Sequence, residues 1–155
     1  MPLIQAFSAD ADYEDKPVEA GRYPLRITSV KVKEAGENAK RPGAKYIAVG
    51  FAIEGADGAS TLFHNFNLPW SEENPGPNGE LDEPAATRMM MRDLMRFFKA
   101  FGIPNDAAIE EDTVAEQLVG LTSESCTVTK VEQRDRDTNK PIPGEFKNEL
   151  RLPRV

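Results

Sequence analysis

Residues that commonly build disulfides and metal sites are scarce in this chain of 155 residues, which has one cysteine and one histidine. A lone thiol, Cys126, cannot form an intramolecular disulfide, which favours a reducing compartment. A lone imidazole, His64, excludes a metal site built from several histidines. The chain also lacks a Walker A run, a GxGxxG motif, a basic leader and a long apolar stretch. We therefore expect no cofactor, no bound metal, no signal peptide and no membrane span.

Positive charge is in short supply overall, because the formal net charge is -7. That total argues against a generic nucleic-acid binder, but its distribution is uneven. Residues 21–45 carry seven Lys or Arg against two acids, whereas residues 46–83 carry seven acids and no Lys or Arg. Residues 124–155 are nearly balanced, with seven bases and six acids. These charges could simply form an ordinary solvated surface. The basic segment, however, coincides with a candidate binding loop, which favours a role in binding.

Apolar periodicity predicts five strands and two helices. Alternating apolar residues indicate the strands, and apolar residues at helical spacing indicate the longer helix, with Asp82 as its cap and Gly102 as its stop. Thr113 and Glu116 spell a capping box that begins the shorter helix. The expected strands cover 21–33, 45–55, 60–68, 125–134 and 145–152, and the expected helices cover 83–101 and 114–120.

The first expected strand changes phase along its length. Tyr23, Leu25 and Ile27 alternate on one face, and Val30 and Val32 then continue the pattern on the other phase. An extra residue in a strand produces such a shift, so we predict a β-bulge and a bent strand. A bent first strand suits a small barrel that must curl closed.

The order β-β-β-α-β-β predicts a mainly β fold, specifically a five-stranded OB-type barrel with a helix between strands 3 and 4. Residues 1–20 would form an acidic N-terminal arm, and 21–155 would form the OB-fold domain. In that fold the loops after strands 1 and 4 flank the ligand face. Here those loops cover 34–45 and 134–145, and each carries three Lys or Arg residues.

These loops favour a binding protein for single-stranded DNA with little sequence preference and no catalytic activity. Bases stack on exposed aromatic rings while Lys and Arg contact phosphates. Tyr46 opposes the apolar phase of its strand, and Phe63 shares a face with polar residues, so we expect both rings to stack on bases. The expected phosphate contacts are Arg26, Lys31, Lys33, Lys40, Arg41, Lys45, Lys130, Arg134, Arg136, Lys140 and Lys147.

Two other functions fit the sequence. A non-catalytic interaction or structural adaptor would suit the acidic total charge and the small residues on the second strand. A metal-dependent nuclease is the less favoured alternative. Asp135 or Asp137 followed by Glu145 and Lys147 imitates a nuclease spacing in which carboxylates hold Mg²⁺ and the lysine assists a water.

Several short motifs carry a resemblance that runs from about Val18 to Leu152. They are VEAGRYPLRITSVKVK, KYIAVGFAIEG, a strand with FNL, a helix ending FFKAFGIP, a short VGLT, and FKNELRL with its Asn148. Together they resemble a family of tailed-bacteriophage proteins with an OB-type fold, associated with single-stranded DNA binding in replication and recombination.

The resemblance implies DNA binding without catalysis, in the cytoplasm of the infected bacterial host. It also implies phage or host replication proteins as partners, and it leaves the oligomeric state open. The chain departs from many single-stranded DNA-binding proteins in ending with basic and apolar RLPRV rather than an acidic tail. The acidic insert over 69–83 is a second departure, because it places negative charge beside the third strand.

Overall fold

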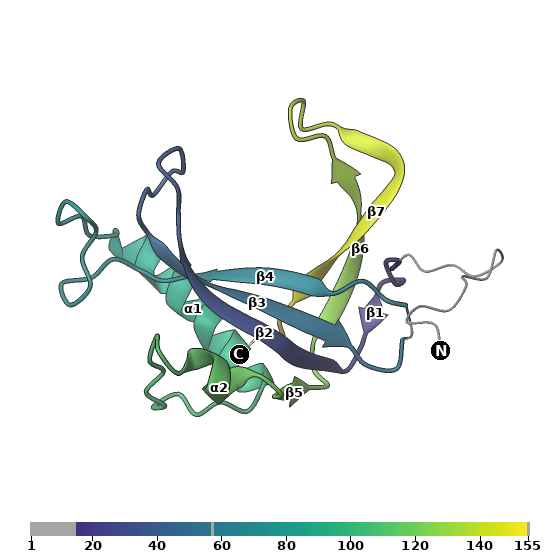
Figure 1. Ribbon diagram of the computed structural model, residues 1–155, viewed down its shortest axis with the longest axis horizontal. Helices are drawn as coiled ribbons and strands as arrows, with labels where there is room; N and C mark the ends of the chain where they lie inside the picture. Colours follow the sequence, from purple (N-terminus) through teal and green to yellow (C-terminus); the bar gives the residue numbers. More distant parts are fainter. Residues whose placement is uncertain (1–14, 57, 155) are drawn as a thin grey trace, which may run out of the picture.

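The computed structural model describes residues 15–56 and 58–154, so most of the expected acidic arm lies outside the described residues. The described chain is mainly β, with two antiparallel sheets and two helices (Figure 1). One sheet has the order β4-β3-β2-β5, from Leu62–Asn67, Lys45–Ile53, Leu25–Glu34 and Thr122–Ser123. The other has the order β1-β6-β7, from Gly21–Arg22, Thr127–Arg134 and Pro141–Arg151.

The first expected strand is divided into β1 and β2 around Tyr23 and Pro24. Proline cannot donate to a strand ladder, which explains a break at this point. The predicted bulge is confirmed, because the register between β2 and β3 shifts between Ile27 and Ser29. The bent first segment therefore contributes to both sheets: β1 pairs with β6, and β2 pairs with β3 and β5.

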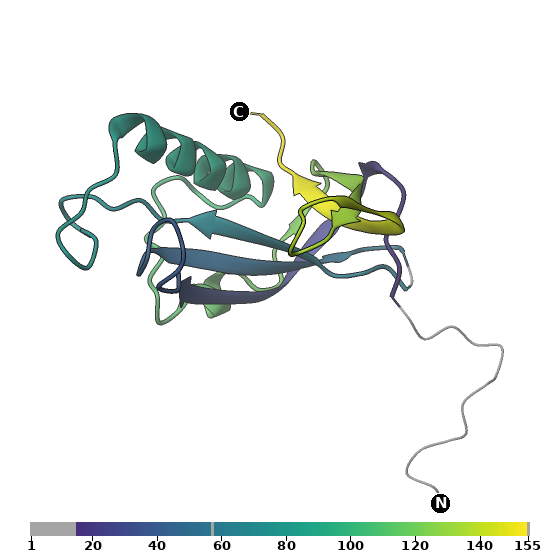
Figure 2. The same ribbon diagram turned by 90° about the horizontal axis from the view of Figure 1, so that it is seen from above.

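Helix α1 spans Pro84–Ala100, close to its expected bounds, and lies along one side of the four-stranded sheet (Figure 2). Proline suits the first turn of a helix, where its missing N–H is not needed. Gly102 follows with φ of 71°, the left-handed conformation that ends many helices. The expected cap at Asp82 is wrong: Glu83 is the N-cap residue, and the Asp82 carboxylate is bound to Arg41 and to the Trp70 amide.

Helix α2 spans Val114–Leu118, shorter than expected. The capping-box hydrogen bond at Thr113 is not formed, because the Thr113 hydroxyl bonds the Gln117 side chain at 3.2 Å instead. Within 15–56 and 58–154, neither helix has the length and hydropathy required of a candidate membrane span.

The main core lies between α1 and the inner face of the four-stranded sheet. Phe51 of β3, Phe66 of β4, and Phe97 of α1 are at most 1% exposed, and the Phe66 and Phe97 rings stack at 4.4 Å between centroids. Phe101 also contacts Phe51, at 5.4 Å. These apolar positions match the alternation in the strands and the 3.6-residue period of the helix.

The expected closed barrel is not observed. Among the described residues, the β4 edge and the β7 edge share no ladder, and the two sheets stay separate. The described part of the arm spans this interval: Lys16 pairs with the backbone at Gly58 and Ser60, just before β4, and Val18 pairs with the Asn148 side chain on β7. We call this interval between β4 and β7 the seam. The arm therefore bonds residues on both sides of the seam and links them there in place of a direct ladder between β4 and β7.

Candidate nucleic-acid interface

The face of the four-stranded sheet opposite α1 carries aromatic, basic and amide side chains in register. Residues directly opposite in an antiparallel pair share a face. Lys33, Tyr46 and Asn67 form one row across β2, β3 and β4. Lys31, Ala48 and Asn65 form the next row, and Gly50 with Phe63 follows. We call this set the outer face.

The centre of the outer face is shallow because of Gly50. A Cβ atom there would lie 2.5 Å from the Ser29 hydroxyl oxygen and 3.3 Å from a Phe63 ring carbon. The glycine therefore lets the Phe63 ring lie close to the backbone of β3 while 73% of the residue remains exposed. This placement agrees with the expectation that Phe63 shares the polar face of its strand. Tyr46 is half-buried, less exposed than expected.

The basic residues predicted on the first half of the chain differ in their partners. Lys31 and Lys33 are exposed on the outer face, and no ion pair with a described residue holds either one. Arg26 continues the same face beside Ala52 and pairs with Glu54 at 2.6 Å. Lys45 pairs with Glu111 at 3.1 Å, and both side chains are about half exposed. Such exposed pairs are weak, so they leave these bases accessible to a phosphate.

Arg41 has a structural role that the sequence did not reveal. Its guanidinium binds the Asp82 carboxylate at 2.5 Å, donates to the Leu68 carbonyl at 3.1 Å and lies 4.6 Å from the centre of the Trp70 ring. These contacts tie the loop between β2 and β3 to the loop before α1. Neighbouring Lys40 is exposed. Of these two predicted phosphate contacts, Lys40 is therefore the one with an accessible charge.

The predicted residues of the last hairpin lie on β6, β7 and their connection, which rises on the same side as the loop between β2 and β3 (Figure 1). Lys130 pairs with Glu19 at 2.7 Å and lies 5.0 Å from the Phe146 ring centre. Arg134 donates to the Asn139 carbonyl at 2.8 Å, and Lys147 lies 3.6 Å from Glu149. The remaining two predicted bases, Arg136 and Lys140, are exposed in the connection.

Asp135 shapes the turn of that hairpin. Its Oδ1 accepts the amides of Asp137 at 2.8 Å and Thr138 at 3.0 Å. These hydrogen bonds, the one from Thr138 first, hold the pKa of the Asp135 carboxyl below its usual value. One carboxylate of the nuclease spacing thus has a role in turn formation. Within the described ranges, no group of three or more His, Cys, Asp or Glu residues is arranged to hold a metal ion.

A groove runs along the seam between β4 and the β6–β7 hairpin, with a volume of about 620 Å³. Phe63 and Asn65 line it from β4, Gln133 from β6, and Phe146 and Lys147 from β7. Phe63 therefore belongs both to the outer face and to this seam groove. Phe146, Asn65 and Gln133 were missed by sequence reasoning. The alternation of Phe146, Asn148 and Leu150 along the last strand was the signal that could have found the ring.

Two titratable groups lie within the fold rather than on the outer face. His64 alternates with Leu62 and Phe66 on the inner phase of β4, and burial lowers the pKa of its imidazole while Asp93 and Glu149 oppose that shift. Burial raises the pKa of the Cys126 thiol, whose Sγ lies 3.6 Å from the Ser123 hydroxyl. Both shifts favour the neutral forms.

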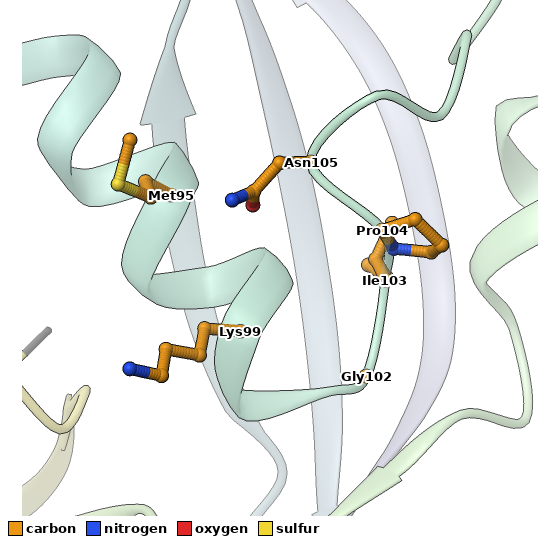
Figure 3. Close-up of a pocket in the computed structure, with 6 residues that line it drawn as sticks. All are labelled: Met95, Lys99, Gly102, Ile103, Pro104 and Asn105. Carbon is orange, nitrogen blue, oxygen red and sulfur yellow. The ribbon is translucent and has the colours of Figure 1, made fainter.

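A second hollow lies at the end of α1, away from the outer face (Figure 3). Met95 and Lys99 of the helix line it together with the segment from Gly102 to Asn105. Exposed Met89 and Met91 lie on the same helix. Lys99 and Arg92 are exposed cations of α1 that lie outside the predicted interface.

No family model matches the chain, and no curated protein matches its sequence. The functional assignment therefore depends on the residues and their geometry.

Proposed function

We propose that the protein binds single-stranded DNA with little sequence preference and serves phage DNA replication or recombination. The observation that carries the proposal is the register of β2, β3 and β4, which brings Lys31, Lys33, Tyr46 and Phe63 onto one face. Aromatic rings offer stacking surfaces for any base, and lysines neutralise the backbone. Binding is non-catalytic in this proposal.

The strand connectivity supports a finer fold assignment within the same proposal. The first segment, β1 with β2, pairs with β3 on one side and with β5 and β6 on the other, while β6 pairs with β7. This is the neighbour pattern of a five-stranded OB-type barrel that lacks its last ladder. The loops that flank the ligand face in that fold correspond here to the β2–β3 and β6–β7 connections.

The resemblance to tailed-phage proteins supplies the biological setting. On that proposal the protein acts in the cytoplasm of the infected bacterium, beside phage or host replication proteins. Asn148, one of the motif residues, bonds the backbone of Val18 and of Thr129. A structural need for that amide gives a reason for the motif that is independent of DNA.

The test is fluorescence anisotropy with a labelled oligothymidylate at several salt concentrations. Affinity should fall steeply with salt, because each phosphate contact on a single strand contributes a slope of about -0.7. The double variant Lys31→Glu/Lys33→Glu should weaken binding and flatten the slope by about 1.4 if both lysines contact phosphates.

The matched control reverses two exposed charges on α1, Arg92→Glu/Lys99→Glu. It changes the net charge by the same amount on a helix that lies on the opposite side of the four-stranded sheet from the outer face. If both double variants lost the same affinity, the effect would depend on net charge alone, and the outer face would not be the binding surface. Absence of binding by the unaltered protein would reject DNA binding and favour the adaptor. Cleavage of the oligonucleotide in Mg²⁺ would favour the nuclease.

A further inference from the structure

The seam groove combines two aromatic walls with polar edges. Phe63 on β4 is 73% exposed, and Phe146 on β7 is 36% exposed. The groove volume of about 620 Å³ falls within the roughly 300–1,000 Å³ of small-ligand sites. The two rings give the groove apolar walls, and a ligand with apolar faces that covered them would remove this apolar area from water.

Polar groups of the groove are placed beside those rings. Asn65 is exposed on β4, and the Gln133 amide nitrogen donates to the Phe146 carbonyl at 3.3 Å, which leaves its side-chain oxygen as an acceptor. Lys147 brings an ammonium group, with Glu149 3.6 Å from it. An occupant should therefore be planar and apolar on its faces but carry donors and acceptors on its edge.

Lys130 helps to position the Phe146 ring. Its ammonium lies 5.0 Å from the Phe146 ring centre and is held there by Glu19 at 2.7 Å. A cation at this distance is attracted by the ring and fixes the two side chains relative to each other. Phe146 is thereby positioned on an otherwise exposed hairpin, as a stacking platform needs to be.

We propose that the seam groove is a nucleobase subsite, which takes an unpaired base of the bound single strand. The base would stack on Phe146 and present its edge to Asn65 and Gln133. This inference rests on the proposed function and deepens it. Phe63 connects the two surfaces, because it lies both on the outer face and in the groove.

The experiment compares a labelled oligothymidylate with an oligonucleotide of the same length whose sugars are abasic. Phe146→Ala should weaken binding to the base-bearing strand by about 5- to 150-fold, the range expected for a lost base–aromatic stack. Binding to the abasic strand should change by less than about twofold, because phosphate contacts remain. Met95→Ala, an exposed apolar residue of α1, is the control and should affect neither strand.

Phe146→Leu keeps most of the side-chain volume and removes the ring, so it separates stacking from packing. It should reproduce the loss on the base-bearing strand. Equal weakening on both strands, or no weakening on either, would overturn the subsite while DNA binding itself stands. If the unaltered protein binds neither strand, the proposed function fails and the subsite fails with it.

Discussion

Strand β3 buries five of its nine residues, whereas β7 buries one of its eleven. Strand β3 pairs with β2 and β4, whereas β7 is an edge strand that pairs with β6 alone, so β3 also has the fuller backbone pairing. The difference in burial lies in the apolar side-chain layer: β3 faces the Phe51, Phe66 and Phe97 cluster, while much of β7 faces water. Burial of apolar area supplies most folding free energy, so the four-stranded sheet should carry the stability of the molecule.

The hairpin of β6 and β7 has few buried side chains. A hairpin with little burial is only marginally stable by itself. Its exposed faces leave Phe146, Lys147 and the turn residues accessible. The two sheets therefore differ in role. The four-stranded sheet contains most of the core, and the other sheet presents exposed side chains next to the outer face.

The same substitution in the two regions gives the largest expected contrast. Phe51→Ala should lower the free energy of unfolding by about 3–5 kcal/mol, because it opens a cavity in a packed cluster. Phe146→Ala should lower it by less than about 1 kcal/mol, as exposed substitutions generally do. Urea denaturation followed by circular dichroism measures both. Similar losses in the two variants would break the comparison.

Asp82 tests whether loops of the four-stranded sheet add to its stability. The carboxylate accepts hydrogen bonds from Arg41 and from the Trp70 amide at 2.7 Å, and its side chain is 10% exposed. Asp82→Ala should cost about 2–3 kcal/mol, since it leaves a half-buried guanidinium without its anion. Glu73→Ala, an exposed acid of the same loop, is the control and should stay within about 0.5 kcal/mol. Thermal melts of both variants decide the question.

Asn148 lies where the two sheets meet the arm. Its side chain makes three hydrogen bonds to the backbone, two with Val18 and one with Thr129. Asn148→Ala should cost about 1–2 kcal/mol, less than three ordinary hydrogen bonds because water can reach the half-buried groups. Asn67→Ala, on the exposed face of β4, should cost little. A negligible effect at Asn148 would mean that the arm does not connect the sheets energetically.

Substitution of His64 should give the smallest change in stability. This residue lies on β4, which borders the seam between the two sheets. Its folded-state pKa lies below the unfolded value, so the unfolded chain binds the proton more readily as pH falls below about 6.5. The free energy of unfolding should therefore drop between pH 7.5 and 5.5. In His64→Gln this part of the pH dependence should vanish. Parallel pH profiles for the two proteins would show that burial at His64 does not act on stability.

Local sequence signals were sufficient for most elements. Alternation located β3, β4 and β6, helical spacing located α1, and the phase change after Ile27 predicted the bulge. These features depend on residues close in the chain. Barrel closure could not be predicted in this way, because it depends on pairing between the distant edges of β4 and β7; in the structure the arm bonds both sides of that seam and the edges form no ladder.

The candidate site was predictable to a similar extent. Strand phase predicted Tyr46 and Phe63 on the face opposite the core, and the basic segment predicted Lys31 and Lys33 as phosphate contacts; the register brings all four onto one face. Arg41 could not be assigned from sequence, because its partners Leu68 and Asp82 are 27 and 41 residues away. Phe146 was missed for the related reason that a groove between β4 and β7 requires their relative position.

The pair of hydrogen bonds between Val18 and Asn148 joins residues 130 positions apart. Closing so long a loop costs conformational entropy, and contacts of large sequence separation form slowly. The seam should thus be set late in folding, after the four-stranded sheet, and should be among the first contacts to open. The rate of hydrogen exchange at the Val18 amide would then report how often the seam opens locally while the core stays folded.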